Sequence, residues 1–150
     1  MDFLTAMSAS QSGMSAQRFR MNIISANLAN AQTTRTPEGG PYRRQQVVFG
    51  ALPGQKTFEQ ELRDTQVGQQ DTNPLQVKVL GVVQDKRAPI LKYDPSHPDS
   101  NDQGFVAMPN INPTEEMVDL MLATRSYEAN VAAFNASKMM ALKALDIGKQ

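Results

Sequence analysis

The stretch FLTAMSASQSGMSAQRFRMNIISANLANAQ, residues 3–32, carries the pattern that decides the fold. Its large apolar side chains recur on two positions of a seven-residue repeat: Met7, Met14, Met21 and Leu28 on one, and Phe3, Ile24 and Ala31 on the other. Two such positions per heptad form the narrow apolar stripe of a coiled coil. No proline interrupts the stretch, so it predicts one long helix, from Phe3 to about Gln32, that pairs with another helix.

A second stretch of this kind runs from Asn112 to about Ile147. Asn112 is a good N-cap, Pro113 suits the first helical position, and Glu115 supplies an acidic residue in the first turn. Its heptad rows are Leu120, Tyr127, Phe134 and Ala141 on one position, and Met117, Thr124, Val131 and Leu145 on the other, where Lys138 interrupts. Apolar stripes near both ends of the chain predict that the two helices pair as a coiled coil.

The middle of the chain differs in composition, because all nine prolines lie between Pro37 and Pro113. Four short segments bounded by Gly, Pro, Asn or Asp predict strands: Tyr42–Phe49, Leu75–Gln84, Ile90–Tyr93 and Gly104–Met108. The glutamine-rich segment 51–74 has little pattern and predicts a flexible loop. The predicted class is α+β, with an axial helix at 1–35, a β-rich middle domain at 36–111, and an axial helix at 112–150.

The surface of the first helix is unusual, because Asp2, Arg18 and Arg20 are the only charged residues from Met1 to Thr34. A long helix exposed to water normally carries many charges on its outer face. Small, uncharged polar side chains instead favour a helix that is packed on more than one side. Cover by the same chain is the alternative, but a small middle domain cannot wrap two helices of this length, so we expect other subunits to supply the cover.

Composition excludes several classes of function. Fifteen basic residues balance fifteen acidic ones, so the chain has no net charge with which to attract nucleic acid. It has no cysteine and one histidine, which excludes disulfide frameworks and multi-His metal sites. Met1-Asp2-Phe3-Leu4 places an acid where a signal peptide needs basic residues, which predicts the absence of a cleaved signal peptide. We therefore expect no metal, no cofactor and no small-molecule substrate.

The segment Asp94–Asp99 is the part of the chain that most resembles a catalytic site, because it holds His97 beside a serine and two aspartates. A catalytic triad needs groups that converge from separate elements, so a structural turn is the favoured interpretation. The segment 99–104 begins like a calcium loop but departs from that motif at its fifth and twelfth positions. Tyr42-Arg43-Arg44 could contact phosphates, but two arginines in a neutral protein favour a solvated or interface surface. The sequence predicts no catalytic residue.

Two terminal motifs resemble those of the bacterial flagellar rod, hook and related axial proteins. The first is SANLANA at Ser25–Ala31, with Thr33 and Thr34 behind it. The second is EMVDLM at Glu116–Met121 followed by RSYEANV at Arg125–Val131, and it closes with residues 141–148. Within this family, Tyr42-Arg43-Arg44 and the segments 93–99 and 106–110 are similar to the proximal-rod type.

The resemblance implies a structural subunit of the basal-body rod, the hollow shaft that transmits torque from motor to hook. It implies export through the flagellar type III apparatus and a location in the periplasm-spanning rod. The implied partners are other copies of this chain, other rod proteins and the junction between the rod and the MS ring. It also implies that the terminal helices pair and pack side by side around a channel, with the middle domain outside.

The resemblance and the heptads together predict interface residues on both helices. They are Met7, Met14, Met21, Ile24, Asn27, Leu28 and Asn30 on the first, and Leu120, Tyr127, Asn130, Val131, Phe134, Ala141 and Leu145 on the second. We expect the asparagine amides to bond to neighbouring subunits. Two other functions remain open from the sequence: a soluble helical adaptor that binds one partner through its ends, and an enzyme using His97 with Asp94 or Asp99.

Overall fold

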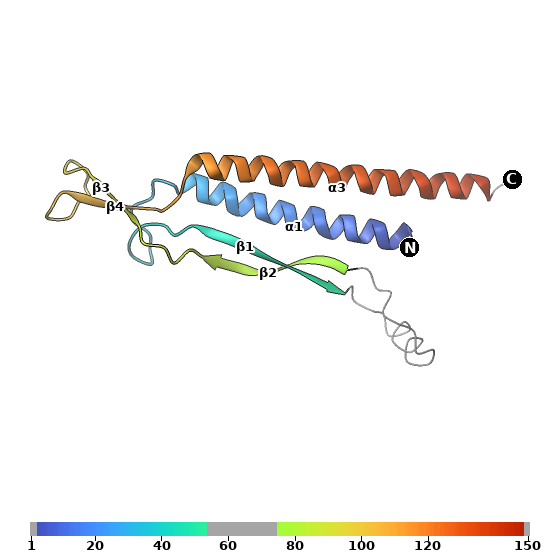
Figure 1. Cartoon of the computed structure of the whole chain (residues 1–150), viewed down its shortest axis with the longest axis horizontal. Coiled ribbons are helices and arrows are strands. Elements are labelled where there is room, and N and C mark those ends of the chain that lie inside the picture. Colours follow the sequence, from blue (N-terminus) through green and yellow to red (C-terminus); the bar gives the residue numbers. More distant parts are fainter. Residues whose placement is uncertain (1–2, 54–74, 149–150) are drawn as a thin grey trace, which may run out of the picture. The chain divides into compact units, whose positions relative to one another are not determined.

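The computed structural model describes residues 3–53 and 75–148. Its elements in chain order are α1 (Phe3–Ala29), β1 (Gln45–Pro53), β2 (Leu75–Gln84), β3 (Ile90–Tyr93), β4 (Phe105–Met108) and α3 (Pro113–Ile147) (Figure 1). Two long helices with short strands between them give the α+β class that the sequence predicts. Helix α1 ends at Ala29, before the predicted end, and a turn follows. Helix α3 is capped as predicted, because Asn112 Oδ1 accepts a hydrogen bond of 3.1 Å from the Thr114 amide.

The strands form two sheets of two strands each, β1 with β2 and β3 with β4 (Figure 1). Strands β2 and β3 have the predicted bounds. Strand β1 begins at Gln45 instead of Tyr42, since the Tyr42 amide donates to the Thr33 carbonyl and holds the preceding loop against the end of α1. Residues 51–53, predicted as loop, extend β1 because β2 supplies a hydrogen-bonding partner. The rest of the predicted loop, 54–74, lies outside the described residues.

The chain forms two compact units, each with a stretch of both helices and part of the β1–β2 sheet. Of the described residues, the first unit comprises 3–17, 49–53, 75–80 and 126–148. The second comprises 18–48 and 81–125, and it contains the whole β3–β4 sheet. No helix within the described part of the chain is both long and apolar enough to cross a membrane.

The covered side of α3 follows a 3-4 spacing. One row of buried or half-buried positions is Leu120, Tyr127, Phe134 and Ala141, and the other is Glu116, Ala123, Asn130 and Ser137. The second row differs from the predicted row of Met117, Thr124, Val131 and Leu145, in which Val131 is half-buried and Thr124 Oγ1 lies 3.5 Å from Met21 Sδ of α1. The prediction was wrong for Met117 and Leu145, which are 48% and 64% exposed, because it searched for large apolar residues, whereas the covered row holds small and polar ones.

Helix α1 is covered partly by its own chain. In the first unit the Val77 amide of β2 donates a 3.2 Å hydrogen bond to Ser12 Oγ. In the second unit Asn27 bonds to the backbone of Gln45 at the start of β1. The expectation that other subunits supply the missing cover is therefore wrong in part, because the β1–β2 sheet lies against α1.

Three hydroxyl groups of α1 are also satisfied without neighbouring subunits. Ser8 Oγ donates to the Thr5 carbonyl at 2.8 Å, Ser10 Oγ to the Ala6 carbonyl at 3.0 Å, and Ser12 Oγ to the Ala9 carbonyl at 2.7 Å. Such bonds to the preceding turn remove the cost of covering a serine side chain. An uncharged, serine-rich helix can consequently be packed on several sides.

Small residues let α1 and α3 approach closely in the first unit. A Cβ atom placed on Gly13 would lie 3.1 Å from the side-chain amide of Asn130. This spacing is tighter than ordinary van der Waals contact, so a larger residue at position 13 would require the Asn130 amide to move. Ala16, only 3% exposed, is covered in the same part of α1.

The β3–β4 sheet is an antiparallel pair in which Ile90 lies opposite Met108 and Tyr93 opposite Phe105. The Tyr93 and Phe105 rings form an edge-to-face pair with centroids 5.3 Å apart. Val106 is 2% exposed and lies in the core of the second unit. Gly104 precedes β4 with a φ of +79°, and a Cβ there would lie 2.9 Å from the Tyr93 ring.

Replacing Gly104 with alanine is expected to destabilise this sheet by about 1–3 kcal/mol, because a side chain is strained at positive φ and would displace the Tyr93 ring. Native-state hydrogen exchange of the β3 and β4 amides measures the loss. Gly81→Ala is the matched control, since a Cβ at Gly81 meets nothing within 4 Å. Equal protection of these amides in the two variants would contradict the assigned role of Gly104.

Candidate functional site

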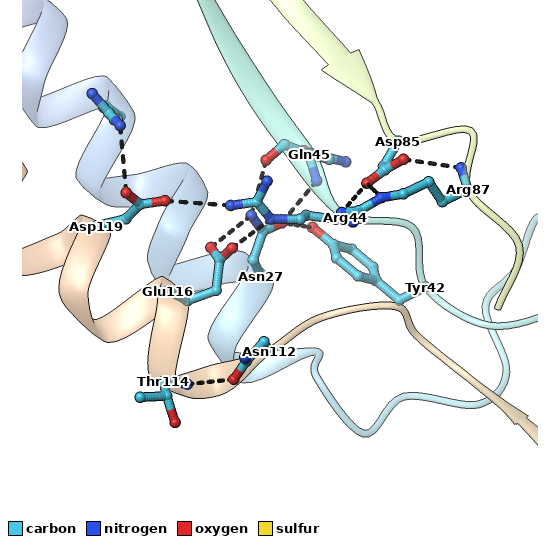
Figure 2. Close-up of polar contacts among 11 residues, drawn as sticks. Asn27, Tyr42, Arg44, Gln45, Asp85, Arg87, Asn112, Thr114, Glu116 and Asp119 are labelled. Atoms are coloured by element: carbon cyan, nitrogen blue, oxygen red, sulfur yellow. Dashed lines mark hydrogen bonds and ion pairs between the residues drawn. The ribbon is translucent and has the colours of Figure 1, made fainter. Parts of the chain in front are cut away.

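The second unit contains a buried cluster of polar side chains from α1, α3 and the start of β1 (Figure 2). We call it the polar cluster. Its members are the side chains of Arg20, Asn27, Tyr42, Arg44, Glu116 and Asp119 and the backbone of Gln45, with Tyr42 and Arg44 in the loop that leads into β1. Asn27 and Glu116, each 1% exposed, are its most deeply buried side chains. Buried polar groups are costly unless their hydrogen bonds are made, so the arrangement of partners decides what the cluster contributes.

The amide of Asn27 has its hydrogen-bonding capacity filled. Its Nδ2 donates to the Gln45 carbonyl at 2.9 Å and to Glu116 Oε2 at 3.0 Å. Its Oδ1 accepts from the Gln45 amide at 2.9 Å and from the Tyr42 hydroxyl at 3.2 Å (Figure 2). Two donors and two acceptor positions are all that an asparagine amide offers. Asn27 therefore pairs with the Gln45 backbone as a neighbouring strand would, and joins α1 to β1.

Glu116 of α3 places a negative charge beside the Asn27 amide. Arg44 Nε donates to Glu116 Oε1 at 2.5 Å, and Arg44 Nη2 donates to Asp119 Oδ2 at 3.3 Å. Asp119 Oδ1 lies 3.8 Å from Arg20 Nη2 of α1. The Arg44 side chain is 16% exposed, and Asp119 and Arg20 are about one-third exposed. Two arginines thus balance two carboxylates, and the most buried carboxylate has both a charged and a neutral donor.

Tyr42 lies at the edge of the polar cluster, and its pKa is raised above its ordinary value of 10.0. Burial of the hydroxyl is the larger cause, and the negative charge of Glu116 adds to it. Both effects favour the protonated phenol, which donates its hydrogen bond to Asn27 Oδ1.

The raised pKa of Tyr42 predicts a loss of stability in alkali. Below about pH 10 the phenol is protonated in both the folded and the unfolded chain, and its contribution is fully present. As the pH rises through the folded-state pKa, the unfolded chain has already released the proton, so the free energy of unfolding falls. Urea titrations on either side of pH 10 should show a smaller alkaline loss for Tyr42→Phe than for the unsubstituted chain. Equal losses would contradict this role of Tyr42.

Both helices that contribute to the polar cluster lie in segments that match families of known proteins. Residues 3–35 match the family described as flagella basal body rod protein, and residues 102–147 match the family described as flagellar basal body rod FlgEFG protein C-terminal. The flagellar basal-body rod protein FlgC of Borreliella burgdorferi is 41% identical over 155 residues, with 98% of each chain covered. FlgC of Bacillus subtilis is 43% identical over 148 residues, covering 96% of this chain and 97% of the relative. FlgC of Salmonella typhimurium is 37% identical, covering 99% and 100%.

The chain belongs to the FlgC family of flagellar basal-body rod proteins. The two matched segments contain α1 and α3 almost entirely. Asn27 and Glu116 of the polar cluster lie within them, whereas Arg44 lies in the stretch between them. The FlgC similarity covers that stretch as well, in agreement with the proximal-rod resemblance of Tyr42-Arg43-Arg44.

In this FlgC-family chain, most of the predicted interface residues lie on covered sides of the helices. The half-buried ones on α1 and in its following turn are Met7, Met14, Met21, Leu28 and Asn30, and Ile24 is buried. Those half-buried on α3 are Leu120, Tyr127, Asn130, Val131, Phe134 and Ala141. Leu145 is exposed. Contact of any of them with another subunit stays a prediction.

The asparagine side chains bond within their own chain. For Asn27 this corrects the expectation of bonds to neighbouring subunits, because its capacity is filled, whereas for Asn30 and Asn130 such bonds stay a prediction. All four hydrogen bonds of the Asn27 amide are intrachain. Asn30 Nδ2 donates to the Ala26 carbonyl at 2.9 Å and Oδ1 accepts from Thr33, so this side chain closes the end of α1. Asn130 Nδ2 donates to the Ser126 carbonyl at 2.9 Å. Asparagine side chains readily bond to nearby backbone groups of their own chain, and a single sequence does not reveal such bonds.

The segment around His97 is built as a turn. Asp94 Oδ1 accepts from the Ser96 hydroxyl at 2.7 Å, and His97 Nδ1 accepts from the Asp99 backbone amide at 3.1 Å. Asp99 Oδ2 accepts from the Thr34 hydroxyl at 2.7 Å. Ser96 thus bonds to Asp94 instead of His97, which differs from the order of a catalytic triad. The described residues include no group of three or more His, Asp or Glu placed to hold a metal ion.

Glu116 and Asp119 were missed as candidate site residues. Glu116 lies on a heptad row that the sequence analysis did not assign to the covered side, because it assigned rows with large apolar residues. The available signal was that Glu116, Ala123 and Asn130 recur at seven-residue intervals beside the Leu120 row. Arg44 was noted, but only as one of a pair of surface arginines.

Proposed function

We propose that this chain is a structural subunit of the flagellar basal-body rod and that it assembles through α1 and α3. The observation that carries the proposal is the similarity to FlgC rod proteins over nearly the whole chain, together with rod-family matches over both helices. A structural role also agrees with a buried polar cluster whose bonds are directed inward, to its own chain.

The exposed side of α3 supports contacts with other subunits. Large apolar side chains exposed along the helix are Met117, Val118, Met121 and Leu122 in the second unit, and Met139, Met140, Leu142, Leu145 and Ile147 in the first. Single exposed apolar residues are ordinary, but contiguous ones favour a protein interface. Other copies of this chain and other rod proteins are the proposed partners. The interface residues predicted from the heptads belong to this proposal.

We further infer that α1 and α3 pair as a coiled coil. The 3-4 spacing of the covered positions on α3 supports this pairing, as does the approach of Gly13 to Asn130. The division into terminal axial helices and a middle domain, with boundaries near residues 35 and 111, belongs to the same proposal.

The finer assignment is to the proximal rod, in the periplasm-spanning part of the basal body, near the MS ring. Export through the flagellar type III apparatus is part of this assignment. It rests on the resemblance of Tyr42–Arg44 and the segments 93–99 and 106–110 to that type. We propose no enzymatic activity, because the relatives are named as rod proteins and His97 bonds within a turn.

Isolation of basal bodies tests the proposed function. In a strain lacking this chain we expect loss of motility and of rod assembly, both restored by a tagged copy that remains with detergent-extracted basal bodies. A cytoplasmic complex with one partner at a fixed one-to-one ratio would favour the adaptor. Full motility without the chain would overturn the rod assignment, and His97→Ala in the restoring copy should leave motility unchanged.

A further inference from the structure

The apolar stripe of α1 repeats with little variation. Met7, Met14 and Met21 are the same residue at successive heptads, and Leu28 is of similar size. Methionine is flexible and tolerates changes in its neighbours. If α1 slid along α3 by seven residues, about 10.5 Å, each of these residues would take the place of a residue of nearly the same size one heptad away. It would then meet the same neighbours on α3. The stripe alone therefore discriminates weakly between registers.

The row of small residues on the covered side of α3 adds little discrimination by shape. This row contains Ala123, Asn130 and Ser137, which are small or polar. Small side chains offer few knobs that would fit only one set of holes on α1. Among the covered positions of this row, Glu116 is the exception, because it carries a charge and is 1% exposed.

The polar cluster is satisfied in one register only. Glu116 receives hydrogen bonds from Asn27 of α1 and from Arg44 beside β1, and Asn27 is fixed to β1 through both polar groups of the Gln45 backbone. A shift of one heptad that brings Leu28 to the place of Met21 would carry Asn27 about 10.5 Å from Glu116 and leave a buried carboxylate without a donor from α1, which ends at Ala29. A shift in the opposite direction would bring Arg20 near Glu116 but would still break the bonds of Asn27 to Gln45 and Tyr42.

We propose that the polar cluster sets the register of α1 against α3, and that its contribution is to specificity more than to net stability. A buried ion pair is often no more stabilising than apolar residues of similar volume, whereas a buried polar residue in a coiled coil can fix register. The proposal concerns the fold of the single chain and holds whether or not the chain assembles into a rod.

Cysteine pairs test the register directly, because the chain contains no cysteine of its own. Met21 Sδ and Thr124 Oγ1 lie 3.5 Å apart, so Met21→Cys with Thr124→Cys reports the observed register. Leu28→Cys with Thr124→Cys reports a shift of one heptad. With the polar cluster intact, a short thiol-specific cross-linker should favour the first pair on the order of 100-fold or more, as expected when a shift leaves a buried charge unpaired.

The decisive variant replaces the centre of the cluster with apolar residues, Asn27→Leu, Arg44→Met and Glu116→Leu together. We expect helix content, measured by circular dichroism, to be retained while the two cross-link yields become comparable. Exclusive cross-linking of the Met21 pair in this folded variant would overturn the proposal. Asp85→Asn with Arg87→Gln, which removes a partly exposed ion pair of the same unit, is the control and should keep the original preference.

A milder variant keeps the test decisive if the triple replacement does not fold. Asn27→Leu with Glu116→Leu leaves Arg44 paired with the partly exposed Asp119. Comparable yields of the two cross-links in this variant would support the register role. Loss of helix content in both variants would overturn the proposal, since it would show that the polar cluster is needed for stability itself.

Discussion

Replacing Arg44 with alanine is expected to lower the free energy of unfolding of this chain by about 3–5 kcal/mol. Arg44 Nε donates to Glu116 Oε1, and the Glu116 side chain is 1% exposed. Removing the arginine leaves a carboxylate on the covered side of α3 whose remaining donor is the neutral amide of Asn27. The uncompensated charge, more than the lost ion pair, produces the large effect.

Urea unfolding followed by circular dichroism measures this change, and Arg43→Ala is its matched control. Arg43 precedes Arg44 in the chain and is exposed, so its removal should change stability by less than about 0.5 kcal/mol. Each substitution removes one positive charge, and the two positions are adjacent. Any effect of the change in net charge is therefore the same in both variants. Equal unfolding midpoints for the two variants would show that Arg44 does not neutralise Glu116.

The effect of Arg44→Ala is the opposite of that expected when the whole centre of the cluster becomes apolar. Removing one partner leaves the other buried and charged, whereas removing Asn27, Arg44 and Glu116 together leaves nothing unsatisfied among the three. A large loss for the single variant and a small one for the triple variant would separate the cost of an unpaired charge from the net contribution of the cluster.

The elements of the fold could be predicted from local signals in the sequence. Heptad spacing, the proline-free stretch before Pro37 and the Asn112 cap lie within single segments, and they identified α1 and α3. Strands β2 and β3 followed from short runs between turn residues. The start of β1 was misplaced because Tyr42 bonds across the chain to Thr33, a contact that β-propensity does not encode.

The polar cluster could not be predicted in the same way. Arg44 and Glu116 are 72 residues apart, and Asn27 and Glu116 are 89 apart. No periodic pattern links positions at such separations. The heptad rule also misled at α3, because a row with Glu116, Ala123 and Ser137 looks like a solvent-facing row until its partners are known. Polar residues on a covered row signal specific pairing, and the choice of partner requires the three-dimensional fold.

The second large effect is expected at the exposed face of α3. Replacing Met117 and Met121 together with glutamate should abolish rod assembly and motility while leaving the chain folded. These side chains are 48% and 58% exposed, so their own chain loses little packing when they change. Glutamate and methionine have similar helix propensities, so the helix should persist. In an assembled rod, however, the new carboxylates would lie in an interface where charge is costly.

Motility in soft agar and recovery of the variant with isolated basal bodies measure the outcome, and circular dichroism of the purified chain verifies the fold. Lys86→Glu is the control, because it also changes the charge by two units at an exposed position but lies outside both helices. Leu120→Glu provides a second comparison: Leu120 is half-buried on the covered side of α3, so this change should lower stability as well as assembly. A motile strain carrying glutamate at 117 and 121 would mean that subunits contact one another elsewhere.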